Sequence, residues 1–196
     1  MVRIIKILIV SCMLYTFIQA QTSSNKALVL DGNNNFLKIA DSVGVTPSYT
    51  RSIWVKFNAL DTTSAFIDNY YYLDSGQYYG VAWRYYPGVG MQIAHCAGGG
   101  WGTDNSHTYS WTPQIDQWYN LTITYNSSDS LSKIYIDGIL ASSKQIPPAS
   151  FSDSTILKIG TENQSVGNTH FLNGIIDEAA VWATALDSST INDWLY

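Results

Sequence analysis

The chain has 196 residues and a formal net charge of −5, from 10 basic and 15 acidic side chains. A hydrophobic fraction of 46% is enough for a folded core, which argues against a disordered chain. Only 13% of the residues are charged, which argues against a coiled coil. No basic run is present, so nucleic-acid binding is not expected, because phosphate binding needs clustered Lys and Arg.

The first 20 residues have the layout of a secretory signal peptide. Arg3 and Lys6 form a short basic region, residues 4–18 are mostly apolar, and the small residue Ala20 ends the segment. We therefore predict a signal peptide over residues 1–20 and one mature domain over residues 21–196. The expected location of the mature chain is secreted, periplasmic or at the cell surface.

The cysteines and the hydropathy refine this prediction. Cleavage in front of Cys12, as in bacterial lipoproteins, is a minor alternative that would leave a lipid anchor. Otherwise Cys96 is the cysteine that remains after cleavage, so no internal disulfide is expected, and we interpret Cys96 as a small buried hydrophobe. No later segment reaches the ~20 apolar residues of a membrane span, so none is predicted in the mature chain.

The rest of the chain consists of short β-favouring segments separated by turn residues. In residues 49–57, Ile53, Val55 and Phe57 alternate with polar or larger side chains, as in a strand with one buried face. Asp137-Gly138 lies between two such runs and predicts a type I′ hairpin turn. A helix is expected only over residues 187–194. Strands are predicted over residues 27–30, 36–40, 49–57, 118–125, 133–136, 139–141, 155–160 and 174–182.

The middle of the chain differs in composition from the rest. Residues 69–111 hold 11 aromatic residues and eight of the 14 glycines. A core strand needs aromatic residues but not glycines, whereas a binding surface built on adaptable loops uses both. This segment is therefore the predicted ligand-binding region.

Four stretches, in order, resemble the LamG-like jelly-roll domains of the concanavalin A-like lectin/glucanase superfamily. The resemblance implies an all-β, two-sheet antiparallel jelly-roll sandwich with one short C-terminal helix. It also implies that the strands at 27–30 and 174–182 lie side by side. It does not fix a function, because the fold hosts lectins, adhesion modules and enzymes. The four stretches are Ala27-Leu28-Val29-Leu30-Asp31-Gly32 with Phe36-Leu37-Lys38-Ile39, Thr50 to Lys56, Trp118 to Tyr125 with Ile134-Tyr135-Ile136-Asp137-Gly138, and Leu157-Lys158-Ile159-Gly160 with Phe171 to Glu178 and Ala185-Leu186-Asp187.

Enzymatic activity is not expected. Glucanases of this superfamily carry closely spaced acidic residues on one strand, and a retaining pair needs carboxyls ~5–5.5 Å apart. Glu162 is expected in a loop, and Glu178 and its neighbour Asp177 point to opposite faces of a strand. Gln92 and His95 also differ in parity, unlike the Gln-x-His strand of alginate lyases.

A structural calcium ion is a candidate cofactor. Asp31 begins an oxygen-rich turn, and Asp177 lies in the strand that the resemblance places beside it. Calcium is bound by six to eight carboxylate, amide and carbonyl oxygens. The alternative is that Asp31-Gly32 is only a turn and Asp177 pairs locally, since turns favour Asp without a metal.

Carbohydrate binding is the leading functional hypothesis. Flat aromatic rings pack against the apolar faces of sugars, while amide and carboxylate groups fix the hydroxyls. The expected partner is an extracellular glycan or, alternatively, a matrix or cell-surface protein bound by an adhesion module. The predicted ligand-binding residues, expected to line one solvent-accessible depression, are Trp83, Tyr85, Trp101 and Trp111. The tryptophans expected in the core are Trp54, Trp118 and Trp182.

Overall fold

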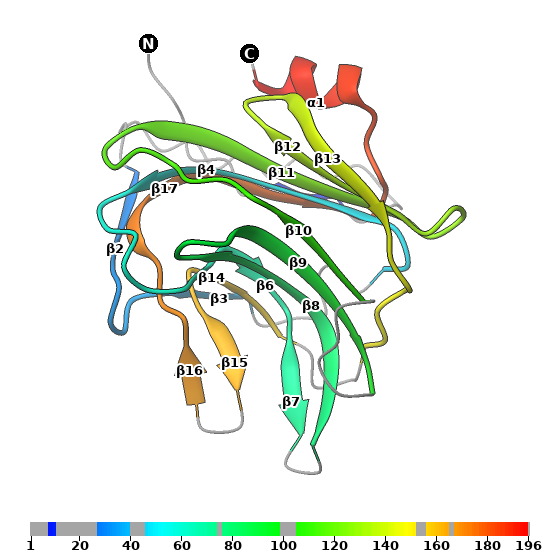
Figure 1. Ribbon diagram of the computed structural model, residues 1–196, viewed down its shortest axis with the longest axis horizontal. Helices are drawn as coiled ribbons and strands as arrows, with labels where there is room; N and C mark the ends of the chain where they lie inside the picture. The colour runs from blue at the N-terminus through cyan, green and yellow to red at the C-terminus, as the bar shows by residue number, and fades with distance from the viewer. Residues whose placement is uncertain are drawn as a thin grey trace.

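Two layers of β-structure pack face to face, with a short helix on the outside of one layer (Figure 1). The computed structural model describes residues 8–10, 27–39, 46–73, 76–98, 105–151, 156–164 and 167–195. The predicted all-β fold with one C-terminal helix is confirmed.

The first layer is a sheet that we call the back sheet. Its order is β1 (Leu8–Val10), β17 (Asn173–Trp182), β4 (Tyr49–Phe57), β11 (Trp118–Asn126), β12 (Leu131–Ile136) and β13 (Ile139–Gln145), with β2 (Leu28–Asp31) also beside β17. The expected neighbours at the chain ends are confirmed, because β2 and β17 pair antiparallel. β1 pairs parallel with the later part of β17. β1 lies within the predicted signal peptide, whose cleavage stays a prediction.

The second layer, the front sheet, is assembled from two sheets. One has the order β10 (Ser106–Tyr109), β9 (Gly90–Ala97), β8 (Gln77–Tyr86) and β5 (Ser64–Ala65), with β7 (Tyr71–Leu73) pairing with β8. The other has the order β3 (Leu37–Ile39), β14 (Leu157–Ile159) and β6 (Ile67–Asp68). Main-chain hydrogen bonds from Phe66 to Trp83 and from Asn69 to Val81 join the two sheets at β8.

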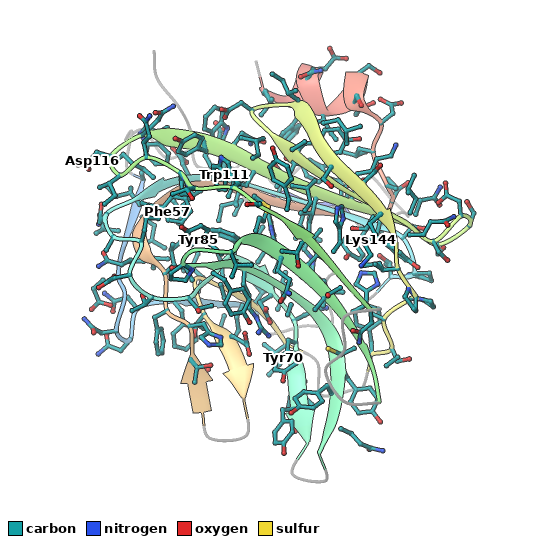
Figure 2. The ribbon with its side chains drawn as sticks, in the orientation of Figure 1. Phe57, Tyr70, Tyr85, Trp111, Asp116 and Lys144 are labelled. Atoms are coloured by element: carbon teal, nitrogen blue, oxygen red, sulfur yellow. The ribbon has the colours of Figure 1, made fainter. Side chains whose placement is uncertain are left out.

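The core lies between the front and back sheets because strand alternation directs one set of side chains inward. In β4 the buried set includes Ile53, Val55 and Phe57, as predicted. In β8 the matching set is Val81, Trp83 and Tyr85. Figure 2 shows the rings of Phe57, Tyr85 and Trp111 gathered between the layers.

The prediction of core tryptophans was only partly right. Trp54 alternates with Ile53 and Val55, so it lies on the outer side of the back sheet, where it is half-buried. Trp118 is also half-buried. Trp182 is nearly buried, and its ring packs edge-on against Trp194 of the helix, with centroids 5.0 Å apart.

The predicted hairpin at Asp137-Gly138 is confirmed. Both residues have positive φ, 51° and 77°, which is the backbone of a type I′ turn. Helix α1 (Ser188–Leu195) lies against this turn, so a Cβ on Gly138 would overlap Asn192 and Leu195. No helix within the described residues is long and apolar enough to cross a membrane.

A buried arginine ties the two layers together. Arg51 projects inward from β4 and is fully buried. Its guanidinium donates to the carbonyl of Ile67 at 2.7 Å and to Oδ1 of Asn69 at 2.7 Å. These bonds fix the back sheet against the β6 region of the front sheet.

Two hairpins extend beyond the sandwich at one end of the front sheet. One is formed by β7 and β8, and the other by β15 (Glu162–Gln164) and β16 (Gly167–Thr169). They project in the same direction in Figure 1, and β7 contacts β15. This arrangement brings the first residue of β15 to the front sheet.

Candidate functional site

The site is built on the face of the front sheet that points away from the core, which we call the outer face. In β8, Val81, Trp83 and Tyr85 belong to the core, so the alternate residues face outward. Arg84 pairs in register with Gln92 of β9, which pairs with Thr108 of β10, so these three residues share the outer face.

Burial contradicts half of the predicted ligand-binding set. Trp83 is 0% exposed and Tyr85 is 2% exposed, so both rings belong to the core. The prediction that these two residues line a solvent-accessible depression is therefore wrong. Trp111 is half-buried and packs on the core side against Tyr119, with ring centroids 5.1 Å apart. Trp101 lies outside the described residues.

Tyrosine side chains cluster on the outer face at the base of the β7–β8 hairpin. The rings of Tyr72 and Tyr78 lie 4.8 Å apart, and Tyr78 stacks on Tyr70 at 5.7 Å. The guanidinium of Arg84 lies over the Tyr70 ring at 5.2 Å. Tyr70 is buried, whereas Tyr72 and Tyr78 are half-buried, so the cluster reaches the surface.

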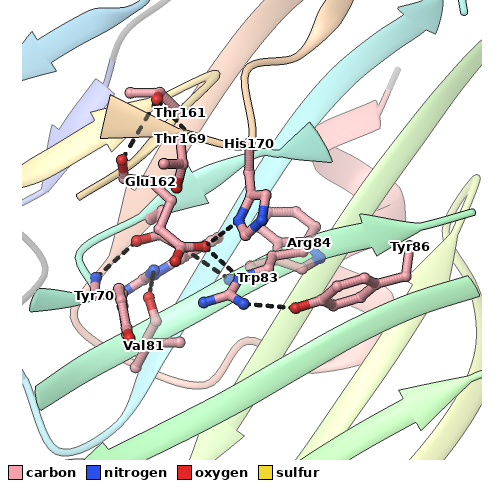
Figure 3. A network of polar contacts seen from close by, with 11 residues as sticks. Tyr70, Val81, Trp83, Arg84, Tyr86, Thr161, Glu162, Thr169 and His170 are labelled. Carbon is pink, nitrogen blue, oxygen red and sulfur yellow. Dashed lines mark hydrogen bonds and ion pairs between the residues drawn. The ribbon is translucent and has the colours of Figure 1, made fainter. Parts of the chain in front are cut away.

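An ionic cluster continues this face toward the second hairpin (Figure 3). Arg84 Nε lies 2.5 Å from Oε2 of Glu162, and Nδ1 of His170 lies 2.9 Å from the same oxygen. Arg84 also donates from Nη1 to the hydroxyl oxygen of Tyr86 at 2.6 Å. Arg84 and Glu162 are buried, but Tyr86 and His170 are partly exposed, so the cluster opens to solvent through these two rings.

A second carboxylate, Asp68 of β6, lies buried beside the ionic cluster. Its Oδ1 accepts the main-chain N–H of Tyr70 at 2.7 Å, and its Oδ2 accepts that of Trp83 at 3.3 Å. Burial raises the pKa of Asp68, and the charge of Glu162 raises it further, against the lowering effect of Arg84. Asp68 therefore joins β6 to β8 and to Tyr70, the residue that precedes β7, beneath the surface.

The charges of Glu162 and Asp68 act on two cations of the outer face, Arg84 and Lys158. Burial alone would lower the pKa of Arg84, but the carboxylates of Glu162 and Asp68 raise it overall. Burial lowers the pKa of Lys158, and the charge of Asp68 opposes that shift. Lys158 donates from Nζ to Oδ1 of Asn168 at 2.5 Å.

The sequence analysis missed this cluster. Glu162 was expected in a loop, whereas it begins β15 and is fully buried. The parity of Arg84 and Tyr86 was visible in the sequence, but parity alone does not say which face of β8 is inside. His170 and Glu162 reach Arg84 through the β15–β16 hairpin, which has no local signature that connects it to β8.

The structure does not bring Asp31 and Asp177 together, and calcium binding by the chain stays a prediction. Asp31 pairs with Asn173, and Asp177 lies four residues further along β17, which is roughly 13 Å at ~3.3 Å per residue. Asp31 Oδ1 instead accepts main-chain N–H groups, that of Asn33 at 2.9 Å among them. These bonds lower the pKa of Asp31 despite its exposure. Among the described residues, no group of three or more His, Cys, Asp or Glu is placed to hold a metal.

A family model described as the concanavalin A-like lectin/glucanases superfamily matches residues 31–192. The chain belongs to this superfamily. The resemblance seen in the sequence is thereby confirmed. No curated protein matches the chain.

Several solved structures are similar in fold to the chain. A CBM40 of the Ruminococcus gnavus IT-sialidase has a TM-score of 0.70 and 9% identity, over 87% of this chain and 96% of that one. The same domain was also solved bound to α2,3 sialyllactose. Domain 4 of AbnA, a GH43 extracellular arabinanase from Geobacillus stearothermophilus, was solved with arabinotriose. It has a TM-score of 0.62 and 20% identity, over 90% of this chain and 80% of that one.

A third structure, from Bacteroides ovatus ATCC 8483 and assigned to carbohydrate binding, has a TM-score of 0.64 and 16% identity. It matches 84% of this chain, but this chain spans only about half, 47%, of that one. At such identities these likenesses show the shared fold.

Proposed function

We propose that the chain is a non-catalytic carbohydrate-binding domain, exported by its signal peptide, that binds a glycan on the outer face of the front sheet. The observation that carries the proposal is the ionic cluster of Arg84, Glu162 and His170. Burying such a cluster costs free energy, and apolar replacements are often neutral or stabilising. A buried cluster that opens at a surface is therefore better explained by ligand binding than by folding stability.

The neighbouring side chains suit a sugar. Tyr72, Tyr78 and Tyr86 are partly exposed on the same face, and their rings offer flat apolar surfaces for sugar C–H groups. Gln92 and Thr108 add polar groups and are linked by a hydrogen bond of 3.2 Å. The solved relatives that bind sialyllactose and arabinotriose support the same class of ligand for this fold.

The two carboxylates of the site support a non-catalytic role. A glycosidase needs an acid and a second carboxylate that both touch the substrate. Here Glu162 is 0% exposed and shares Oε2 between Arg84 and His170. Asp68 is 1% exposed and both of its oxygens accept main-chain N–H groups. Neither carboxylate is presented to a ligand.

A glycan array followed by a matched pair of variants tests the proposal. The protein should bind at least one glycan, and Tyr86→Ala should weaken that binding about tenfold or more while the melting temperature stays within a few degrees. Val89→Ala, at an exposed turn residue, is the control and should bind as the unaltered protein does. Absence of binding to every glycan, with retained folding, would overturn the proposal.

A further inference from the structure

We propose that Tyr86 and His170 form a hydrogen-bond donor–acceptor pair that recognises two adjacent hydroxyl groups of a neutral sugar. The inference rests on the proposed function and specifies the chemistry of its ligand. The inference follows from two hydrogen bonds within the ionic cluster: Glu162 bonds to the His170 ring, and Arg84 bonds to the Tyr86 hydroxyl.

The tautomer of His170 is set by Glu162. A carboxylate oxygen accepts hydrogen bonds, so the 2.9 Å contact with Glu162 Oε2 requires the proton on Nδ1 of His170. In the neutral ring Nε2 then carries the lone pair and acts as an acceptor. Among the described residues, the structure gives Nε2 no hydrogen-bond partner, and the side chain is 28% exposed. Nε2 is therefore available to accept a hydrogen bond from a ligand.

The hydroxyl of Tyr86 has the opposite role. A guanidinium only donates, so in the 2.6 Å bond from Arg84 Nη1 the Tyr86 oxygen is the acceptor. The hydroxyl proton of Tyr86 is then directed away from Arg84. Because donation by a cation polarises the O–H bond, Tyr86 becomes a better donor to a ligand.

The two rings lie close together and are held in place from below. Their centroids are 6.4 Å apart and their planes are inclined by 65°. Arg84 and Glu162, which are buried and joined to each other, fix Tyr86 and His170 respectively. A fixed donor beside a fixed acceptor matches a vicinal diol, in which one hydroxyl accepts from Tyr86 and the next donates to His170.

The pair itself favours hydroxyl groups over a carboxylate. A carboxylate only accepts hydrogen bonds, so it could accept from Tyr86 but could not donate to Nε2 of His170. A hydroxyl both donates and accepts, so two adjacent hydroxyls can satisfy both rings. The ionisable groups around the pair are Glu162 of β15, Arg84 of β8, Asp68 of β6, Lys158 of β14 and, beside these, Lys38 of β3 and Arg51 of β4.

Periodate chemistry provides a direct test, because periodate cleaves the carbon–carbon bond between adjacent hydroxyls. Binding is measured by biolayer interferometry to immobilised xylan, galactan, arabinan and dextran, before and after mild periodate oxidation and borohydride reduction. A β-1,3-glucan, whose internal residues lack adjacent free hydroxyls, and sialyllactose serve as further probes. We expect binding to at least one untreated polysaccharide and a loss of about tenfold or more after oxidation. Binding to the β-1,3-glucan should be absent, and sialyllactose should bind no better than lactose.

Two variants test whether the Tyr86 hydroxyl and the His170 ring are responsible for the glycan binding. Tyr86→Phe keeps the ring and removes the donor, and His170→Asn removes the ring at a residue whose φ of 54° Asn tolerates. Each should weaken binding to the untreated polysaccharide about tenfold, within the range for a lost hydrogen bond. Tyr79→Phe removes a hydroxyl from the other side of β8 and should bind normally.

The outcomes separate the inference from the proposed function. Glycan binding that survives periodate, or that Tyr86→Phe and His170→Asn leave unchanged, overturns the diol inference and leaves carbohydrate binding intact. Binding to no glycan at all overturns both. If His170→Asn melts early, ¹⁵N NMR of the unaltered protein decides, because a His170 ring protonated at Nε2 at neutral pH would also overturn the inference.

Discussion

Acidification should destabilise the fold through a histidine buried in the core. His95 of β9 is 1% exposed and packs edge-on against Tyr125, with ring centroids 4.4 Å apart. Its Nδ1 donates to the carbonyl of Pro147 at 2.7 Å, so Nε2 accepts from the hydroxyl of Tyr49 at 2.7 Å. Both ring nitrogens are thus hydrogen-bonded in the neutral form, and a second proton on Nε2 would break the hydrogen bond that Tyr49 donates to it.

The size of the effect follows from the shift in pKa. Burial lowers the pKa of His95 from 6.5 to about 4; the bond to Pro147 opposes this shift and the charge of Arg51 adds to it. Between pH 6.5 and about 4, His95 is therefore protonated in the unfolded chain but remains neutral in the folded protein. The contribution of His95 to stability is fully present above pH 6.5 and is lost as the pH falls toward 4. Between pH 7 and pH 5 the loss is about 2 kcal/mol at ~1.36 kcal/mol per pKa unit.

Urea unfolding followed by tryptophan fluorescence at pH 7, 6 and 5 measures this loss. His95→Gln does not titrate, so although it is less stable at pH 7, its stability should fall by about 2 kcal/mol less than that of the unaltered protein on going to pH 5. His107→Gln provides a second test, because burial and the charge of Lys144 also lower the pKa of His107 to about 4. Parallel stability curves for the unaltered protein and His95→Gln would refute the argument.

Three further predictions concern single sites. Trp83→Ala should lower the free energy of unfolding by ~3–5 kcal/mol in chemical denaturation, because the ring is fully buried; a near-normal stability would restore Trp83 as a surface residue. Gly138→Val should lower the melting temperature and expose Trp194 in fluorescence, because a β-branched residue resists φ of 77° and would displace α1; an unchanged spectrum would contradict the type I′ turn. Asp31→Ala should lower the melting temperature slightly and equally in EDTA and in calcium chloride, because its hydrogen bonds shape the turn; a shift seen only in calcium chloride would indicate a bound ion.

Local patterns in the sequence were sufficient for much of the fold. The turn at Asp137-Gly138 and the inward face of β4 each depend on residues a few positions apart, where steric and hydrophobic rules act directly. The pairing of β2 with β17 spans most of the chain, and it was predicted from the family resemblance and not from local pattern.

The candidate site was less predictable because both faces of β8 carry the same kinds of residue. In β8, aromatic residues occupy both parities, so the sequence shows two opposite faces without saying which one is buried. The face with Trp83 and Tyr85 is the core face, and the face with Arg84 and Tyr86 is outside. Glu162 joins Arg84 from 78 positions away, and no spacing rule relates charges brought together by tertiary packing.

The thiol of the buried Cys96 can be used to measure how often the buried layer beneath the outer face becomes exposed to solvent. Cys96 is 1% exposed and clusters with Tyr70, Ala82 and Ala94 beneath the site. Burial raises the pKa of its thiol to about 12, so the reactive thiolate is scarce at neutral pH. A thiol reagent should therefore label Cys96 only during opening of this sheet face. The labelling rate would measure how often the cluster around Cys96 opens. A glycan bound on the outer face should slow that rate.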